Sequence, residues 1–331
     1  MSYLSDRVRS LHPARREFLK KSFVFLGGLT SASPSPRSAQ AADENSLIAQ
    51  HTLGDSSHTG VMAGKAGPPK APAPRVFDAH LHCPGDDGNT GQWYPITKTF
   101  NEFVAYLDRT GVQRGIINSQ RSMDAKTAAD FVAGNREVAR HVETYKGRFL
   151  GACVVNPRFV DEALREVEDC RKKLGFVWVG ELCNYIVNPY QYTCKEFEQL
   201  VQQVVKMNMI LQVHTELEEE EYIIRKFPQA TLVFAHFGDS HEEEHIFKRI
   251  DLVGQNKNCY LDTSGYGHDR VGVLEYAVKS IGPDRILFGS DFTVNDPSTV
   301  LARIHNSFLT EEQKNKILSH NVEALLKKFG A

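Results

Sequence analysis

Two histidines separated by one residue form the first chemically suggestive pattern in the sequence. Residues 77–83 are FDAHLHC, so His80 and His82 flank a leucine, and Asp78 lies two residues before His80. Successive side chains of a β-strand point to opposite faces, so both imidazoles would project from one face. Such a pair could hold a divalent cation. It also fits a strand with one hydrogen-bonded core histidine and one exposed histidine, because a short HxH pattern often arises by chance.

The surrounding sequence alternates between short apolar runs and longer amphipathic segments. Segments 99–111, 160–175 and 271–282 have helical spacing, and Thr310 to Gln313 forms a capping box before the last helices. The apolar runs are RVFDAHLH, RGIINS, RFLGACVVNP, GFVWVGELC, MILQVHT, TLVFAHFG, NCYLDTSG and RILFGSDF. Near-continuous apolar strands alternating with helices indicate parallel pairing. This order predicts an α/β fold, a (β/α)8 TIM barrel with extra C-terminal helices, with an open doubly wound sheet as the alternative.

Residues that could bind a metal or move a proton close five of the eight apolar runs. In a (β/α)8 barrel the carboxyl ends of the strands carry the active site. The residues at these ends are His80 and His82, Glu181, His214, His236 and Asp291. A chance sequence would not place such side chains at so many strand ends.

Four of these runs together resemble a known superfamily. DAHLH, QVHT, FAHFG and GSDF occur in this order, one per expected strand, and HNVEALL follows near the carboxyl end. The set resembles the metal-dependent amidohydrolase superfamily, especially its amidohydrolase-related branch of hydrolases and non-oxidative decarboxylases. The resemblance implies that His80, His82, His214 and Asp291 bind one divalent metal. Imidazole and carboxylate ligands suit zinc, which is the expected ion, with manganese or iron as alternatives.

The roles of His236 and Glu181 stay open at this stage. In one-metal relatives the matching histidine acts on the substrate as a general base or electrostatic partner, and in two-metal relatives it is a ligand. We expect the first role, because the fourth run, GFVWVGELC, lacks the lysine that usually bridges two ions. Glu181 could instead bridge them as a carboxylate, or contact the substrate, or be a solvated loop residue.

Two reactions fit this site, and both use a small-molecule substrate. The leading expectation is a hydrolase that cleaves an amide, ester or lactone with metal-activated water. The alternative is a non-oxidative decarboxylase, a lyase acting on an aromatic or unsaturated acid, in which His236 or Asp291 protonates the carbon. A non-catalytic barrel that keeps the site only for stability or metal binding is the third hypothesis. Candidate substrate contacts at strand ends and loops are Trp93, Tyr94, Asn118, Ser119, Arg121, Arg136, Asn156, Arg158, Tyr185, Thr263 and Ser264.

Charge and composition narrow the range of partners. The chain has 39 basic and 41 acidic residues and a formal net charge of −2. It therefore offers no general positive field for nucleic acid or for anionic lipid. A homodimer is a common assembly for such a chain.

The first 74 residues differ from the rest. Arg15 and Arg16 precede EFLKK, a modest apolar run follows, and residues 39–41 are Ala-Gln-Ala. This order predicts a twin-arginine signal peptide over residues 1–41, with no stable membrane anchor after its cleavage. Residues 42–74 are rich in small residues and proline, as in a flexible linker, and the barrel domain occupies 75–331. The expected partner is the twin-arginine translocation machinery, and the expected location is the bacterial periplasm or the medium.

Overall fold

The computed structural model describes residues 75–238 and 243–331. The expected signal peptide and linker lie outside these residues. Within the described part of the chain, no helix is long and apolar enough to cross a membrane.

The parallel sheet follows the chain from first strand to last. Its order is β1-β2-β3-β4-β5-β6-β7-β8, and each neighbouring pair is parallel. Backbone bonds from Ala79 N–H to Phe288 O (2.8 Å) and from Asp291 N–H to His80 O (3.0 Å) join the last strand to the first. The strands are Phe77–Cys83, Arg114–Ser119, Phe149–Cys153, Trp178–Cys183, Ile210–His214, Leu232–Phe234, Cys259–Asp262 and Ile286–Leu287. This is the expected TIM barrel.

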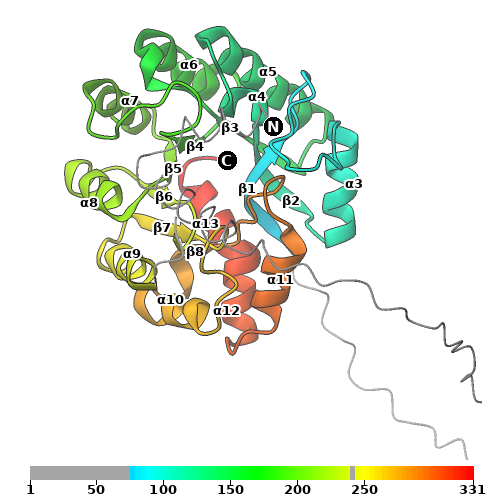
Figure 1. The fold of residues 1–331 in the computed structure, drawn as a ribbon, viewed down its shortest axis with the longest axis vertical. Helices are drawn as coiled ribbons and strands as arrows, with labels where there is room; N and C mark the ends of the chain where they lie inside the picture. Colours follow the sequence, from blue (N-terminus) through cyan, green and yellow to red (C-terminus); the bar gives the residue numbers. More distant parts are fainter. Residues whose placement is uncertain (1–74, 239–242) are drawn as a thin grey trace, which may run out of the picture. The chain divides into compact units, whose positions relative to one another are not determined.

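Helices surround the ring of strands (Figure 1). They are α3 Phe100–Thr110, α4 Gln120–Met123, α5 Ala128–Thr144, α6 Val160–Lys173, α7 Lys195–Lys206, α8 Leu217–Lys226, α9 Glu243–Gln255, α10 Val273–Ile281, α11 Pro297–His305, α12 Glu311–Asn315 and α13 Asn321–Lys328. The helical segments expected at 99–111, 160–175 and 271–282 correspond to α3, α6 and α10. The expected capping box at Thr310 and Gln313 is present at the start of α12.

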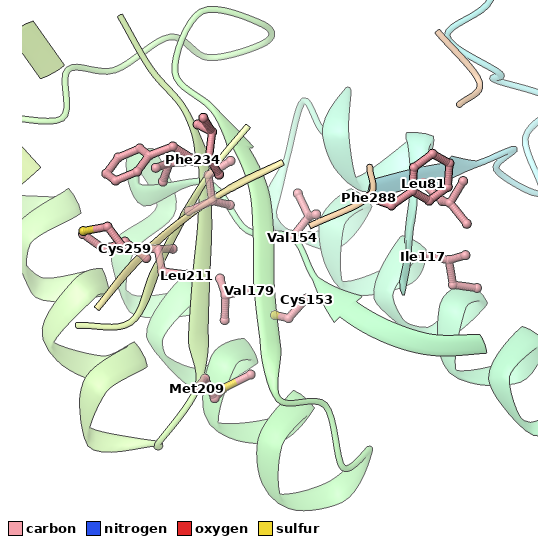
Figure 2. Packing of buried hydrophobic residues seen from close by; sticks show 14 of the residues in the cluster. Leu81, Ile117, Cys153, Val154, Val179, Met209, Leu211, Phe234, Cys259 and Phe288 are labelled. Carbon is pink, nitrogen blue, oxygen red and sulfur yellow. The ribbon is translucent and has the colours of Figure 1, made fainter. Parts of the chain in front are cut away.

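Outward-facing strand side chains form the larger part of the core. Ile117, Val179 and Leu211 belong to one buried cluster that also contains residues of the surrounding helices, such as Phe103 and Phe197 (Figure 2). Burying this apolar surface is the main favourable contribution to folding.

A second cluster fills the interior of the barrel at the amino ends of its strands, and we call it the apolar layer. Residues of α13 complete this layer at the amino-terminal end of the barrel. The apolar layer consists of Phe77, Ala79, Ile116, Ala152, Val177, Trp178, Ile210, Val233, Tyr260, Leu287, Val322, Leu325 and Leu326.

Two register shifts in the sheet change which side chains point into the barrel between the apolar layer and the carboxyl ends of the strands. The β1–β2 register shifts between Asp78 and Leu81, and the β4–β5 register shifts between Val179 and Leu182. Such bulges redirect the side chains that follow them. In β4 the shift includes Gly180, whose φ is +119° and where a Cβ atom would lie 2.1 Å from the Gln212 carbonyl oxygen. Only glycine fits this close approach, which directly precedes Glu181.

Candidate metal centre

The expected site residues meet at the carboxyl ends of the strands. Strand β1 supplies His80 and His82, β4 supplies Glu181, and β5 ends in His214. His236 and Asp291 lie just beyond β6 and β8. Together with Asp262 at the end of β7, we call this group the donor cluster.

One part of the donor cluster contains two imidazoles and two carboxylates. Ligand atoms of His80, His82, Glu181 and Asp291 all lie within 4.8 Å of one another. His82 Nε2 lies 2.9 Å from Asp291 Oδ1. His80 Nε2 lies 3.4 Å from Glu181 Oε2. Nitrogen and oxygen donors in this combination suit a divalent transition metal.

A second part of the donor cluster shares Glu181. His214 Nδ1 lies 3.1 Å from Glu181 Oε1, and His236 Nε2 lies 3.1 Å from His214 Nδ1. Thus Glu181 faces His80 and His82 with one oxygen and His214 with the other. The structure therefore groups His214 with Glu181 and His236, whereas the expected ligand set grouped it with Asp291.

Hydrogen bonding of the first two histidines shows that this donor set fits a cation. His80 Nδ1 lies 2.9 Å from Asp262 Oδ2, and His82 Nδ1 lies 2.8 Å from Asn118 Oδ1. Both partners are acceptors, so in neutral imidazoles the ring proton occupies Nδ1 and Nε2 carries a lone pair. The two Nε2 atoms are only 3.0 Å apart. Two facing lone pairs at this distance require a proton or a metal ion.

Electrostatics in the cluster favour positive charge. Burial disfavours the charged form of His80, but Glu181 and Asp262 outweigh burial and raise its pKa well above the usual range. For Glu181, burial is likewise outweighed by His80 and His214, and its pKa lies well below the usual range. A divalent cation would satisfy the same carboxylates and would compete with the proton for these sites.

Asp291 lies at the open edge of the cluster. Its side chain is 10% exposed, and its Oδ2 accepts a hydrogen bond of 2.9 Å from Asn295 Nδ2. Its φ of +60° is uncommon for a residue with a side chain, and the N–H bond to the His80 carbonyl oxygen holds this conformation. Asp291 is therefore placed where a group can both face the donor cluster and reach a bound molecule.

His236 is more deeply buried than Asp291. Burial and the neighbouring His214 lower its pKa to about 4, so its imidazole is neutral near pH 7. Its backbone also has a positive φ of +70°.

The other expected substrate contacts are distributed unevenly. The Tyr185 ring lies edge-on to the His214 ring, with 5.1 Å between centroids. Arg121 and Arg136 form ion pairs with Glu137 (2.7 Å) and Glu166 (2.8 Å) instead of pointing into the donor cluster. Trp93 is 94% exposed.

Sequence reasoning missed Asp262. This carboxylate is completely buried and lies 2.9 Å from His80 Nδ1. Burial would raise its pKa, but His80 outweighs burial and holds the pKa below the usual range. The available signal was its position at the end of the run NCYLDTSG, beside the candidates Thr263 and Ser264.

Comparison with known proteins was made for sequence and for structure. The family model described as Amidohydrolase matches residues 77–328. A search of curated protein sequences finds no match.

Solved structures with the same fold include decarboxylases of aromatic acids. A 2,6-dihydroxybenzoate decarboxylase in complex with 2,6-dihydroxybenzoate is similar at 16% identity, covering 77% of this chain and 99% of its own, with a TM-score of 0.62. A 5-carboxyvanillate decarboxylase from Sphingomonas paucimobilis has 15% identity, coverage of 76% and 99%, and a TM-score of 0.61. A dihydroxybenzoic acid decarboxylase from Polaromonas sp. JS666, with bound manganese and 2-nitroresorcinol, has 18% identity, coverage of 78% and 98%, and a TM-score of 0.62. At these identities the similarity establishes a shared fold.

Proposed function

The chain belongs to the amidohydrolase family, and from that premise we propose that it is a metal-dependent decarboxylase of an aromatic or unsaturated carboxylic acid. The observation that carries the metal dependence is the pair of Nε2 lone pairs 3.0 Å apart, beside Asp291 at the mouth of the barrel. The decarboxylases that share the fold support the choice of reaction. The sequence alone favours hydrolysis, with decarboxylation as the alternative, and the decarboxylases that share the fold favour decarboxylation.

His80, His82, Glu181 and Asp291 would hold the metal. When bound, a divalent ion supplies positive charge that attracts the substrate carboxylate and stabilises negative charge on neighbouring oxygens. Manganese is bound in the related Polaromonas enzyme, and zinc suits the same nitrogen and oxygen donors. Arg121 and Arg136 pair with Glu137 and Glu166. The metal would therefore be the main positive charge that attracts the carboxylate of the substrate.

Asp291 is the group best placed to deliver the proton. Asp291 Oδ1 faces His82 and would face the metal, whereas Oδ2 would carry the proton and deliver it to the carbon that bears the carboxylate. The bond to the carboxylate then breaks, its electron pair restores the double bond that was used to form the new carbon–hydrogen bond, and carbon dioxide leaves. Asp291 is left as a carboxylate, and its partly exposed edge lets solvent return the proton.

His236 would act on the substrate from the inner side of the site. Its Nε2 faces His214 and Glu181, and its Nδ1 lies 2.7 Å from Ser264 Oγ. A neutral imidazole there can accept a hydrogen bond from a substrate hydroxyl next to the reacting carbon. Tyr185, edge-on to His214, is placed to contact an aromatic ring.

Product analysis tests this proposal. The full chain, loaded with manganese or zinc, is incubated with a panel of hydroxybenzoic and unsaturated acids, and carbon dioxide and the shortened product are quantified together. We expect equal amounts of both products, and we expect neither after removal of the metal with a chelator. Absence of carbon dioxide across the panel with metal-loaded protein would count against decarboxylation.

Hydrolysis is the second candidate, and one observation favours it. The two oxygens of Glu181 face two separate groups of histidines, which is an arrangement suited to two ions. Two-metal sites commonly position water for attack on an ester, amide or lactone. Cleavage of such substrates without carbon dioxide release would select this candidate, and a metal content of two ions per chain would accompany it.

A further inference from the structure

Asp262 connects two histidines of the donor cluster that lie on different strands. Its Oδ2 lies 2.9 Å from His80 Nδ1 and 3.1 Å from Gln212 Nε2. Its Oδ1 accepts bonds from the backbone N–H groups of His236 (3.1 Å) and Ser264 (3.0 Å), and from Ser264 Oγ. Every one of these contacts lies in the buried interior.

The hydrogen-bond donors around Asp262 determine whether its side chain is ionised. Trp178 Nε1 can only donate, and it lies 2.9 Å from Gln212 Oε1, so the Gln212 amide group must point its NH2 toward Asp262. Both oxygens of Asp262 therefore already accept from N–H groups, and the side chain acts as a carboxylate. It follows that His80 Nδ1 donates to Asp262, and that the Nε2 lone pair of His80 faces the site.

Ser264 extends the same logic to His236. A hydroxyl has a single proton, and Asp262 Oδ1 can only accept it. The Ser264 oxygen then accepts a bond from His236 Nδ1, which lies 2.7 Å away; it is also 3.2 Å from His80 Nδ1, which lies nearer to Asp262 Oδ2 at 2.9 Å. His236 consequently carries its proton on Nδ1, and its Nε2 is an acceptor.

We propose that Asp262 is a positioning residue that sets the tautomers of His80 directly and of His236 through Ser264, so that both present an unprotonated Nε2 to the site. For His80 this nitrogen is a metal ligand. For His236 it is an acceptor 3.1 Å from His214 Nδ1, where it can receive a hydrogen bond or bind a second ion. The inference rests on the proposed metal site and holds for either reaction. Carboxylates that orient metal-binding histidines in this way typically contribute a factor of about 10 to 100 in metal affinity.

Nitrogen NMR of the histidine rings tests the tautomers directly. The full chain is labelled with 15N-histidine and loaded with zinc, and ring signals are assigned by comparison with the His80→Gln and His236→Gln variants. We expect both rings to carry the proton on Nδ1 in the unmodified chain. A proton on Nε2 of His236, or an unprotonated Nδ1 in His80, would overturn the proposal.

Variants separate positioning from general structural support. We expect Asp262→Asn to weaken zinc binding by about 10- to 100-fold in competition with a chromophoric chelator. We expect Ser264→Ala to leave zinc affinity within about 2-fold but to give His236 a mixture of tautomers. The matched controls are Asp251→Asn and Ser280→Ala, a remote pair in which Ser280 Oγ donates to Asp251 Oδ1 at 2.6 Å, and both should leave affinity and tautomers unchanged.

Two results would contradict the role of Asp262. The first is unchanged zinc affinity in a folded Asp262→Asn chain, as judged by circular dichroism. The second is a His236 signal in Ser264→Ala identical to that of the unmodified chain. If Asp262→Asn does not fold, the spectrum of the unmodified chain and the Ser264→Ala variant still decide the matter. Decarboxylation can fail while these tautomers are found, so the two proposals are tested separately.

Discussion

The two ends of the barrel interior have opposite chemistry. At the amino ends of the strands, the apolar layer packs Phe77, Trp178 and Ile210 against Leu325 of α13. At the carboxyl ends, the donor cluster buries histidines and carboxylates in the same closed ring of strands. Burying apolar surface stabilises the fold, whereas burying ionisable groups costs free energy unless they are paired. The apolar layer therefore adds to the stability that the outer core provides, whereas the donor cluster lowers stability and provides the chemistry.

The change between the two ends occurs within single strands. In β1, Phe77 and Ala79 belong to the apolar layer, and His80 and His82 belong to the donor cluster. The register shift between Asp78 and Leu81 falls at this change. If the comparison holds, substitutions on the carboxyl-terminal side of the shift should change metal binding or activity. Substitutions on its amino-terminal side should change stability alone.

The largest expected effect is on activity, in the donor cluster. Asp291→Asn removes the proposed proton donor, and we expect the rate to fall by about 10²- to 10⁴-fold, the usual contribution of a general acid. The measurement is the rate of carbon dioxide release. The control is Asp296→Asn in the same loop, because asparagine also serves well as the N-cap of α11. An Asp291→Asn chain with nearly full activity would remove Asp291 from the mechanism.

The next largest expected effect is on stability, in the apolar layer. Leu325 is 1% exposed, and Leu325→Ala should lower the free energy of unfolding by about 2–5 kcal/mol. Urea unfolding measures this loss, and Phe308→Ala, at a residue that is 91% exposed, should change it by less than about 0.5 kcal/mol. Metal affinity should stay the same in both variants. A large loss of metal affinity in Leu325→Ala would mean that the two ends are not independent.

A smaller effect on metal affinity is expected at the shared carboxylate. Glu181→Gln removes one charge from both parts of the donor cluster, and we expect metal to bind at least about 10-fold more weakly. Isothermal titration of metal-stripped protein measures the change. Glu198→Gln is the control, since Glu198 lies on α7 and pairs with Tyr222 and Lys226. Equal affinity in Glu181→Gln and the unmodified chain would show that Glu181 is not a ligand.

The smallest effect concerns an ion pair outside the donor cluster. Burial would raise the pKa of Glu275, but hydrogen bonds from Arg303 and from the Phe308 N–H outweigh burial and lower this pKa from its usual range. A lowered folded-state pKa gives stability that is present above the unfolded value and is lost as the pH falls through the folded value. Glu275→Gln should therefore cost about 0.5–1 kcal/mol at pH 7.

Urea unfolding of metal-free Glu275→Gln and the unmodified chain, at pH 7 and in acid, provides the test. The difference between the two chains should shrink in acid. A difference that grows in acid would have the wrong sign for this ion pair.

Much of the fold could be predicted because its signals are local. Eight apolar runs in order, separated by helical spacing, predict parallel strands, and the structure contains those strands with the expected helices between them. Because the carboxyl ends of the strands meet at one end of a barrel, the residues at those ends also predicted the site residues, from His80 to Asp291.

What could not be predicted depends on contacts between distant residues. The grouping of His214 with Glu181 accompanies the β4–β5 register shift, which no local sequence pattern predicts. Asp262 is a lone carboxylate after an apolar run, and its partner His80 is 182 residues away in sequence. Only the closed ring places them side by side.

Metal content per chain tests the proposed metal centre most directly. The full chain is stripped of metal, dialysed against manganese or zinc, and analysed for bound metal beside the His82→Ala variant and the control His305→Ala, whose histidine is exposed at the end of α11. We expect one ion per chain in the unmodified protein and in His305→Ala, and none in His82→Ala. No stoichiometric metal in the unmodified chain, or full retention in His82→Ala, would contradict the assignment of the donor cluster as a metal site.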